Sequence, residues 1–555
     1  MGGVMRRSLR FISIAAVLAL VLGFSTRAAR TQSTSCFVST VNGAIQGVDR
    51  GASCAFLGVP YGASTAGARR WRPPQPADPW APAILNATAA PNCPGFNPAG
   101  LAVGSEDCLK MIIWTPDPLP ATPAPVLIWL HPGAFVAASA NLAASNGQRF
   151  AEETGTIVVA ANYRLGAFGF LAHAALSSED PTYPSSGNFG MLDQRAAFAW
   201  VRDHIDAFGG DPSRVTIVGS SAGALSVGLH LVSPGSGGLF QRAIMQSGLP
   251  TIRWRTREEA EQQGERFAAA LGCVDPAQVV TCMRTRTRDQ VLNALPIGSD
   301  QVLEGQRVQW SPVVDGLELP DQPRMLFESG AFARVPLMIG TNRDEGWVYV
   351  DRSFPAGLTA AQYDNTLATE FGTDAAAVAS IYGTPDGATP EEAATSRKET
   401  LASIVGDAEY VCEAGRVARL VERMGTPVFE YLFDYELDPV AVDHVIHGLE
   451  VNVLFGNNFA APSAYTLTDA DRELFRAMAG YWARFAALGT PNTDDDAVVH
   501  WPAFKHPSGQ GRGSDKHLWL GVPIREGMRL GEHTCGFWET YFLRTLTGAV
   551  PASAP

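Results

Sequence analysis

The sequence predicts an α/β fold in which a mostly parallel central sheet is flanked by helices. Short apolar runs bounded by turn residues recur along the chain, as buried parallel strands do. Segments with helical periodicity lie between these runs, which favours a parallel sheet. Of the 555 residues, 46% are hydrophobic and 17% are charged, which allows a large buried core and excludes a disordered chain.

The N-terminal 30 residues have the pattern of a secretory signal peptide. Three arginines precede an apolar run at residues 11–24, and small residues follow. The run is shorter than the ~20 residues of a membrane-spanning helix, which argues against an anchor. The pair Arg6 and Arg7 is a weak indication of twin-arginine export rather than the general secretory route. We therefore expect a signal peptide at 1–30 and a single secreted or periplasmic domain at 31–555.

The net charge of the chain indicates which classes of partner it can bind. The chain has 42 Lys and Arg against 55 Asp and Glu, a formal net charge of −13. Loss of residues 1–30 removes five arginines and no acids, so the charge becomes −18. An acidic chain without a basic block is a poor ligand for nucleic acid or an anionic membrane surface. No later apolar stretch is long enough to span a bilayer, so we expect a soluble mature chain. We also expect a monomer.

Eight cysteines agree with export, because an even number behind a signal peptide favours disulfide bonds. Spacing alone does not fix their pairing. The simplest pairing joins neighbours in the sequence: Cys36 with Cys54, Cys93 with Cys108, Cys273 with Cys282, and Cys412 with Cys535. The chain has no C-x-x-C motif, so neither a zinc site nor a redox dithiol is expected.

The sequence predicts strands and helices that alternate along the chain. We expect buried strands at Val126–Leu130, Ile157–Ala160, Val215–Val218, Val335–Ile339 and Val428–Phe433. Helical spacing of apolar residues predicts helices at Met191–Phe208 and Asp469–Leu488. No shift of composition marks a domain boundary between them.

The strand at Val215–Val218 leads into the motif that carries chemistry. Gly219-Ser220-Ser221-Ala222-Gly223 stands between this strand and an apolar, helix-like stretch. G-x-S-x-G at a strand-to-helix turn lifts a serine hydroxyl to the top of a sheet, with glycines where side chains would collide. The sequence therefore predicts that Ser221 is a nucleophile; the alternative is a capping serine in a tight turn.

A nucleophilic serine needs a base and an acid that orients the base. In this type of fold the acid and then the histidine follow the serine in the chain. The loop after Val335–Ile339 offers Asp344 or Glu345, and the loop after Val428–Phe433 offers His444 or His447. The residues alone do not choose within either pair. The H-x-x-H spacing of the histidines could also suggest a metal site, but no carboxylate or cysteine cluster completes one, so no metal or cofactor is expected.

Backbone N–H groups are expected to stabilise the developing oxyanion. One should belong to Ala222, and others to a glycine-containing loop after an early strand. The residues His131-Pro132-Gly133-Ala134-Phe135 fit such a loop, although an ordinary turn would have the same composition.

The sequence resembles the type B carboxylesterases of the cholinesterase/carboxylesterase family, which have the α/β-hydrolase fold. The resemblance covers about residues 36–545. The segments that carry it are 56–61 (FLGVPY), 105–109 (SEDCL), 162–165 (NYRL), 187–194 (GNFGMLDQ), 208–212 (FGGDP), 242–248 (RAIMQSG), 344–346 (DEG), 447–450 (HGLE) and 489–492 (GTPN).

The resemblance implies roles for individual residues. It implies Ser221 as nucleophile, Glu345 as acid and His447 as base, with oxyanion donors at Gly133, Ala134 and Ala222. It also implies that Ser247 supports the histidine–glutamate pair. The family has bridges at Cys93–Cys108, Cys273–Cys282 and Cys412–Cys535, which leaves Cys36 and Cys54 as the fourth pair.

The sequence departs from the family pattern at three places, and the last two departures, Ser220 and a loop without tryptophan, argue against a cholinesterase. Pro132 and Ala134 replace two glycines of the usual H-G-G-G-F loop, and Ser220 replaces the glutamate of the usual G-E-S-A-G. The 14 residues between Cys93 and Cys108 hold no tryptophan, so the main cation–π platform for choline is missing.

The sequence thus predicts a secreted serine carboxylesterase that acts on small-molecule esters through an acyl-enzyme on Ser221. One alternative is a lipase, or an esterase for bulky natural esters or xenobiotics; the short 93–108 loop, where related lipases carry a lid, argues against the lipase. A non-catalytic binding homologue is a further alternative, but such proteins typically lack a triad residue, and all three are present here.

Overall fold

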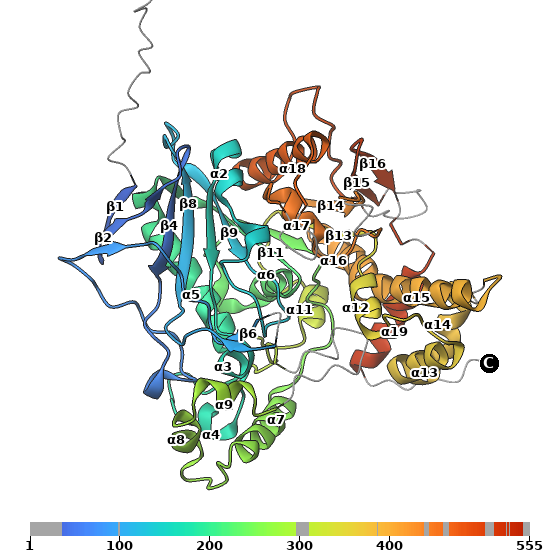
Figure 1. Ribbon diagram of the computed structural model, residues 1–555, viewed down its shortest axis with the longest axis horizontal. Helices are drawn as coiled ribbons and strands as arrows, with labels where there is room; N and C mark the ends of the chain where they lie inside the picture. The colour runs from blue at the N-terminus through green and yellow to red at the C-terminus, as the bar shows by residue number, and fades with distance from the viewer. Residues whose placement is uncertain are drawn as a thin grey trace, which may run out of the picture.

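The computed structural model describes residues 36–547 except for 98–99, 296–309, 384, 386, 438–442, 459–464, 506–514, 529 and 532. The predicted signal peptide at 1–30 lies outside the described residues. Within them, an 11-stranded sheet runs through the molecule in the order β16-β15-β14-β13-β12-β11-β9-β10-β8-β4-β3 (Figure 1). Its strands are β3 (Val48–Asp49), β4 (Ser53–Pro60), β8 (Lys110–Pro116), β9 (Ala124–Leu130), β10 (Ile157–Ala161), β11 (Gly210–Ser220), β12 (Arg242–Gln246), β13 (Leu337–Asn342), β14 (Val428–Phe433), β15 (Lys516–Leu520) and β16 (Arg525–Met528).

The sheet is parallel where the predicted strands lie. Pairing is parallel from β10 through β9, β11, β12, β13 and β14 to β15. Antiparallel strands extend it at both edges, β8, β4 and β3 at one and β16 at the other. This mostly parallel sheet confirms the predicted fold class.

Side chains of one strand alternate between two cores. On β9, Val126 and Ile128 belong to one buried cluster, whereas Leu127 and Trp129 belong to another. Alternation with period two is what a strand buried on both faces requires. Helices α5 (Phe189–His204), α6 (Ala222–Val232), α11 (Pro323–Ser329) and α16 (Cys412–Arg423) contribute to the first cluster, and α2 (Gln148–Thr154), α17 (Leu449–Leu454) and α18 (Asp469–Leu488) to the second.

A third cluster lies beside the sheet at one end of the molecule, among the helices drawn in yellow, orange and red around α13, α15 and α19 in Figure 1. It is built from α12 (Trp347–Ser353), α13 (Ala360–Phe371), α14 (Ala375–Tyr382), α15 (Pro390–Gly406) and α19 (Cys535–Thr547). The Cys412–Cys535 disulfide fastens α19 to α16, so this cluster is covalently tied to the helices on the sheet.

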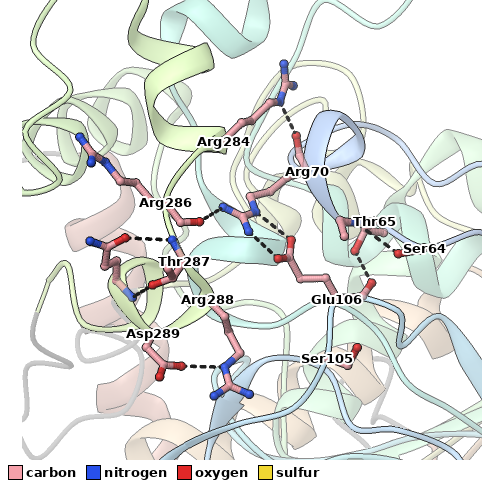
Figure 2. A network of polar contacts seen from close by, with 12 residues as sticks. Ser64, Thr65, Arg70, Ser105, Glu106, Arg284, Arg286, Thr287, Arg288 and Asp289 are labelled. Atoms are coloured by element: carbon pink, nitrogen blue, oxygen red, sulfur yellow. Dashed lines mark hydrogen bonds and ion pairs between the residues drawn. The ribbon is translucent and has the colours of Figure 1, made fainter.

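The other three disulfides are Cys36–Cys54, Cys93–Cys108 and Cys273–Cys282. Together with Cys412–Cys535 they are the four pairs expected from the sequence. Arg70 binds Glu106, which lies in the loop closed by Cys93 and Cys108 (Figure 2). Its guanidinium donates to both carboxylate oxygens of Glu106 and to the carbonyl oxygen of Arg286.

Further helices cover the region around that loop: α3 (Gly166–Phe170), α4 (Ala174–Ser177), α7 (Arg257–Ala270), α8 (Val279–Arg284) and α9 (Arg288–Leu292). Small sheets pair β1 (Phe37–Thr40) with β2 (Gly43–Gln46), β2 with β5 (Ile84–Asn86), and β6 (Gly95–Phe96) with β7 (Ala102–Val103). The Nε of Arg284 donates to the carbonyl oxygen of Arg70, so α8 and the disulfide loop share one polar network (Figure 2).

Candidate active site

Ser221 lies at the sharp turn between β11 and α6. Its φ of 56° and ψ of −125° are unfavourable for a residue with a side chain, and such strain is concentrated at functional sites. Two glycines make the turn possible. A Cβ at Gly219 would lie 2.4 Å from the carbonyl carbon of Gly223, and a Cβ at Gly223 would lie 2.0 Å from the carbonyl oxygen of Leu130. The G-x-S-x-G pattern therefore forms the strained turn that the sequence predicts.

His447 and Glu345 meet although they come from different loops. The His447 Nδ1 lies 2.6 Å from the Glu345 Oε2. Glu345 follows β13 and is fully buried, and its other oxygen accepts a 2.7 Å hydrogen bond from the backbone N–H of Asn342. These contacts fix the carboxylate, and the carboxylate holds the Nδ1 edge of the imidazole and so orients the ring.

Two tyrosine rings flank the imidazole. The ring centroids of Tyr349 and Tyr410 lie 5.6 and 5.1 Å from that of His447. Tyr349 comes from α12, and Tyr410 from a π-helical segment, Asp407–Val411, between α15 and α16. Neither tyrosine was predicted, because Tyr410 lies in a single turn of π-helix and Tyr349 on a helix of seven residues, and such short segments leave no clear periodic signal.

The other members of the two candidate pairs point elsewhere. The ring of His444 stacks on Trp347 at 3.7 Å, and its nitrogens contact Asp443 and Glu399. Asp344 accepts from the backbone N–H of Val445 and forms an ion pair with Arg343. The structure thus brings Glu345 and His447 together and leaves Asp344 and His444 in contacts with neighbouring chain segments.

A second buried carboxylate lies behind the pair. Glu450, one turn after His447, accepts a 2.7 Å hydrogen bond from the Asn342 Nδ2 and a 3.2 Å one from the Gln246 Nε2. Burial, and next the charge of Glu345, raise the pKa of Glu450 to about 7. The sequence motif contained this residue but gave it no role; its spacing of three from the histidine, on a short helix, was the available signal.

The loop after β9 contains Gly133 and Ala134, two of the three expected oxyanion donors, and both line the same cavity as Ser221. Gly133 has a φ of 116°, and a Cβ there would lie 2.3 Å from the carbonyl oxygen of Ala137. Ala134 and Phe135 have left-handed φ values of 50° and 60°. The loop therefore takes the shape that a glycine-rich sequence favours, with alanine in one strained position. Two aromatic residues, Phe135 and Trp310, are buried in the core, and neither is among the residues that line the cavity described below.

His131 begins this loop and is structural. It is buried against the ring of Tyr163 at 4.3 Å, and burial lowers its pKa to about 4. A neutral imidazole at this position adds no charge to the loop.

Ser220 and Ser247 surround the nucleophile. Both are buried, and within the described parts of the chain neither side-chain hydroxyl has a hydrogen-bond partner. Ser247 follows β12 with a φ of 54°, and its N–H donates to the carbonyl oxygen of Gly340. Ser247 thus follows the strand that neighbours β11, and its support of the histidine–glutamate pair, which the resemblance implies, stays a prediction.

A cavity of about 530 Å³ joins these parts. Ser221, His447, Gly133 and Ala134 share its wall, which is otherwise mostly apolar. The lining residues are Pro132, Gly133, Ala134, Val136, Ala137, Ala138, Leu142, Ala144, Ser220, Ser221, Val348, Tyr349, Arg352, His447, Gly448 and Val451.

Across the described ranges no group of three or more His, Cys, Asp or Glu side chains is placed to hold a metal ion. The helices within those ranges also include none long and apolar enough to cross a bilayer.

Comparisons with known proteins agree with this arrangement. A model of the carboxylesterase family matches residues 32–538. The chain is similar to an acetylcholinesterase of Bungarus fasciatus, with 32% identity over 92% of this chain and 87% of the relative.

Proposed function

The chain belongs to the carboxylesterase family and is a serine hydrolase of carboxylic esters, and we propose that it acts through an acyl-enzyme on Ser221. One observation supports this most strongly: a serine in a strained turn shares a cavity with a histidine that is hydrogen-bonded to a buried glutamate. A serine, a base and an orienting acid at one cavity are the requirements of nucleophilic acyl transfer.

In the first step the Ser221 hydroxyl attacks the ester carbonyl while the Nε2 of His447 accepts its proton. The Nδ1–H of His447 donates to Glu345, whose negative charge stabilises the imidazolium. The imidazolium then protonates the leaving alcohol. Water, deprotonated by His447, attacks the acyl-enzyme, and the acid is released with Ser221 restored.

The oxyanion of each tetrahedral intermediate is stabilised by the N–H groups of Gly133, Ala134 and Ala222. Ala222 is the first residue of α6, so its N–H also carries the positive end of the helix dipole. One such donor contributes about 3–4 kcal/mol to the transition state.

The substrates are proposed to be soluble small esters rather than choline esters. The cavity has Ser220 beside the nucleophile, and the Cys93–Cys108 loop lacks a tryptophan that could face a quaternary ammonium. The shortness of the same loop argues against the lid of a lipase.

Secretion, a single domain at 31–555 and a monomeric state are part of the proposal. Four disulfides support an oxidising compartment, since such bonds persist mainly in exported proteins.

The test is hydrolysis by the purified protein. We expect turnover of 4-nitrophenyl butyrate, with much lower activity on emulsified triolein and butyrylthiocholine. Ser221→Ala should lower kcat by at least about 10⁴-fold, whereas Ser213→Ala, an exposed serine early in β11, serves as the matched control. Activity of Ser221→Ala close to that of the control would contradict the proposal.

A further inference from the structure

Helix α12 supplies a cation to the wall of the cavity. Val348 and Arg352 are one helical turn apart and both line it, together with Tyr349. Arg352 is exposed whereas Ser221 is buried, so the guanidinium lies on the solvent side of the cavity. In the described parts of the chain, Arg352 forms no ion pair, whereas its neighbour Asp351 is paired with Lys398 at 2.7 Å.

Nothing acidic in the described wall balances this charge. The lining residues include no Asp or Glu, and the position before the nucleophile, where related enzymes have a glutamate, is Ser220. The two acids next to His447 in the site, Glu345 and Glu450, are fully buried and do not line the cavity. With His447 neutral, Arg352 is the source of net charge among the described lining residues.

We propose that Arg352 binds a carboxylate on the substrate, so that this site prefers esters that carry a carboxylate over their neutral and cationic isosteres. A guanidinium presents two parallel N–H groups that match a carboxylate. The apolar walls reduce water around the pair and strengthen the attraction. The molecule as a whole is acidic, so the preference is a local property of this wall and not of long-range steering. The inference rests on the proposed ester hydrolysis at Ser221.

The experiment compares kcat/KM for matched esters. On the alcohol side the series is 4-butyryloxybenzoate, 4-butyryloxybenzamide and the butyrate ester of 4-hydroxy-N,N,N-trimethylanilinium. On the acyl side, mono-4-nitrophenyl glutarate is compared with 4-nitrophenyl pentanoate. The two arms show in which half of the substrate the carboxylate lies.

The readout is the ratio of kcat/KM for the anionic ester to that for its neutral partner. In at least one arm, Arg352→Gln should lower this ratio about five- to tenfold, as expected for a partly exposed charge pair. Arg352→Lys should retain part of it, and Arg352→Glu should shift the preference toward the cationic ester. Arg472→Gln, at a half-buried arginine of α18 that pairs with Asp469, is the matched control and should leave the ratio as in the wild type.

A ratio that Arg352→Gln and Arg352→Glu leave unchanged in both arms, while neutral esters are still hydrolysed, overturns this inference alone. Failure of every ester, neutral ones included, overturns the proposed function and the inference with it.

Discussion

At the residue scale, two adjacent acids have different environments. Glu345 is fully buried and contacts His447, whereas Asp344 contacts Arg343 and a backbone N–H. The sequence offered both residues as candidates for the acid, because it predicts that they lie in one loop but not which of the two side chains points toward the histidine. Only the resemblance to a family, and then the fold, separates them.

We therefore expect Glu345→Gln to lower kcat by about 10²–10⁴-fold, because a neutral amide cannot stabilise the imidazolium. Asp344→Asn is the matched control and should change kcat by only a few-fold. Steady-state kinetics on a neutral ester at fixed pH measures both. Equal losses in the two variants would show that Glu345 is not the acid.

Glu450 gives a prediction about pH. Its pKa in the folded chain is raised to about 7 from an ordinary value near 4.5, so the folded state binds a proton that the unfolded state releases between these values. Stability from this group is present below about pH 4.5 and is lost as the pH rises to about 7. Glu450→Gln removes the titration, so the free energy of unfolding of the variant relative to wild type should rise over that range, by about 3 kcal/mol at most.

Denaturant unfolding of both proteins at pH 5, 6, 7 and 8 measures this difference. A difference that is independent of pH would mean that Glu450 does not titrate between its unfolded value and 7.

At the element scale, several predicted elements keep their bounds. The strand Val428–Phe433 and the helix Asp469–Leu488 have the predicted bounds, and the strand Val126–Leu130 gains two residues at its start. The predicted strand at Val335–Ile339 instead starts at Leu337 and continues to Asn342. Residues 340–342 pair with β14 through their backbones, so the polar side chains that suggested a loop do not end the strand.

The long predicted helix at Met191–Phe208 ends its α-helical part at His204. A 3₁₀ turn, Ile205–Phe208, follows, and Gly209 closes it with a left-handed φ of 83°. Strands β12 and β15 were not predicted, because each has only three consecutive apolar residues and periodicity cannot identify so short a run.

The oxyanion loop gives a prediction for an element. Gly133→Ala should lower kcat about 10²–10³-fold, because the new Cβ would collide with the carbonyl oxygen of Ala137 and displace the donors. Ala134→Gly keeps the N–H and relieves a left-handed alanine, so kcat should change only a few-fold and Tm should not fall. Kinetics and thermal unfolding of the two variants measure the contrast. Normal activity in Gly133→Ala would place the oxyanion donors elsewhere.

At the scale of the whole molecule, the parallel sheet explains how distant residues come together. β11, β12, β13 and β14 are neighbours, so their carboxyl ends meet at one edge, from which Ser221, Ser247, Glu345 and the loop to His447 extend. The sequence predicts several of these strands, and it predicts that the nucleophile, the acid and the histidine follow in that order along the chain. It does not predict that α12 forms part of the cavity wall. This helix has only seven residues and lies outside the sheet, so its position depends on its packing within the third cluster.

The measurement that tests the central claim most directly is active-site labelling with a fluorophosphonate followed by peptide mapping. If the Ser221 turn, His447 and Glu345 form one hydrolytic site, one label per chain is expected, on the tryptic peptide Val215–Arg242, with the adduct on Ser221. Ser221→Ala should abolish the label, and Glu345→Gln should slow it strongly. A label on a different serine, or undiminished labelling of Ser221→Ala, would contradict the claim.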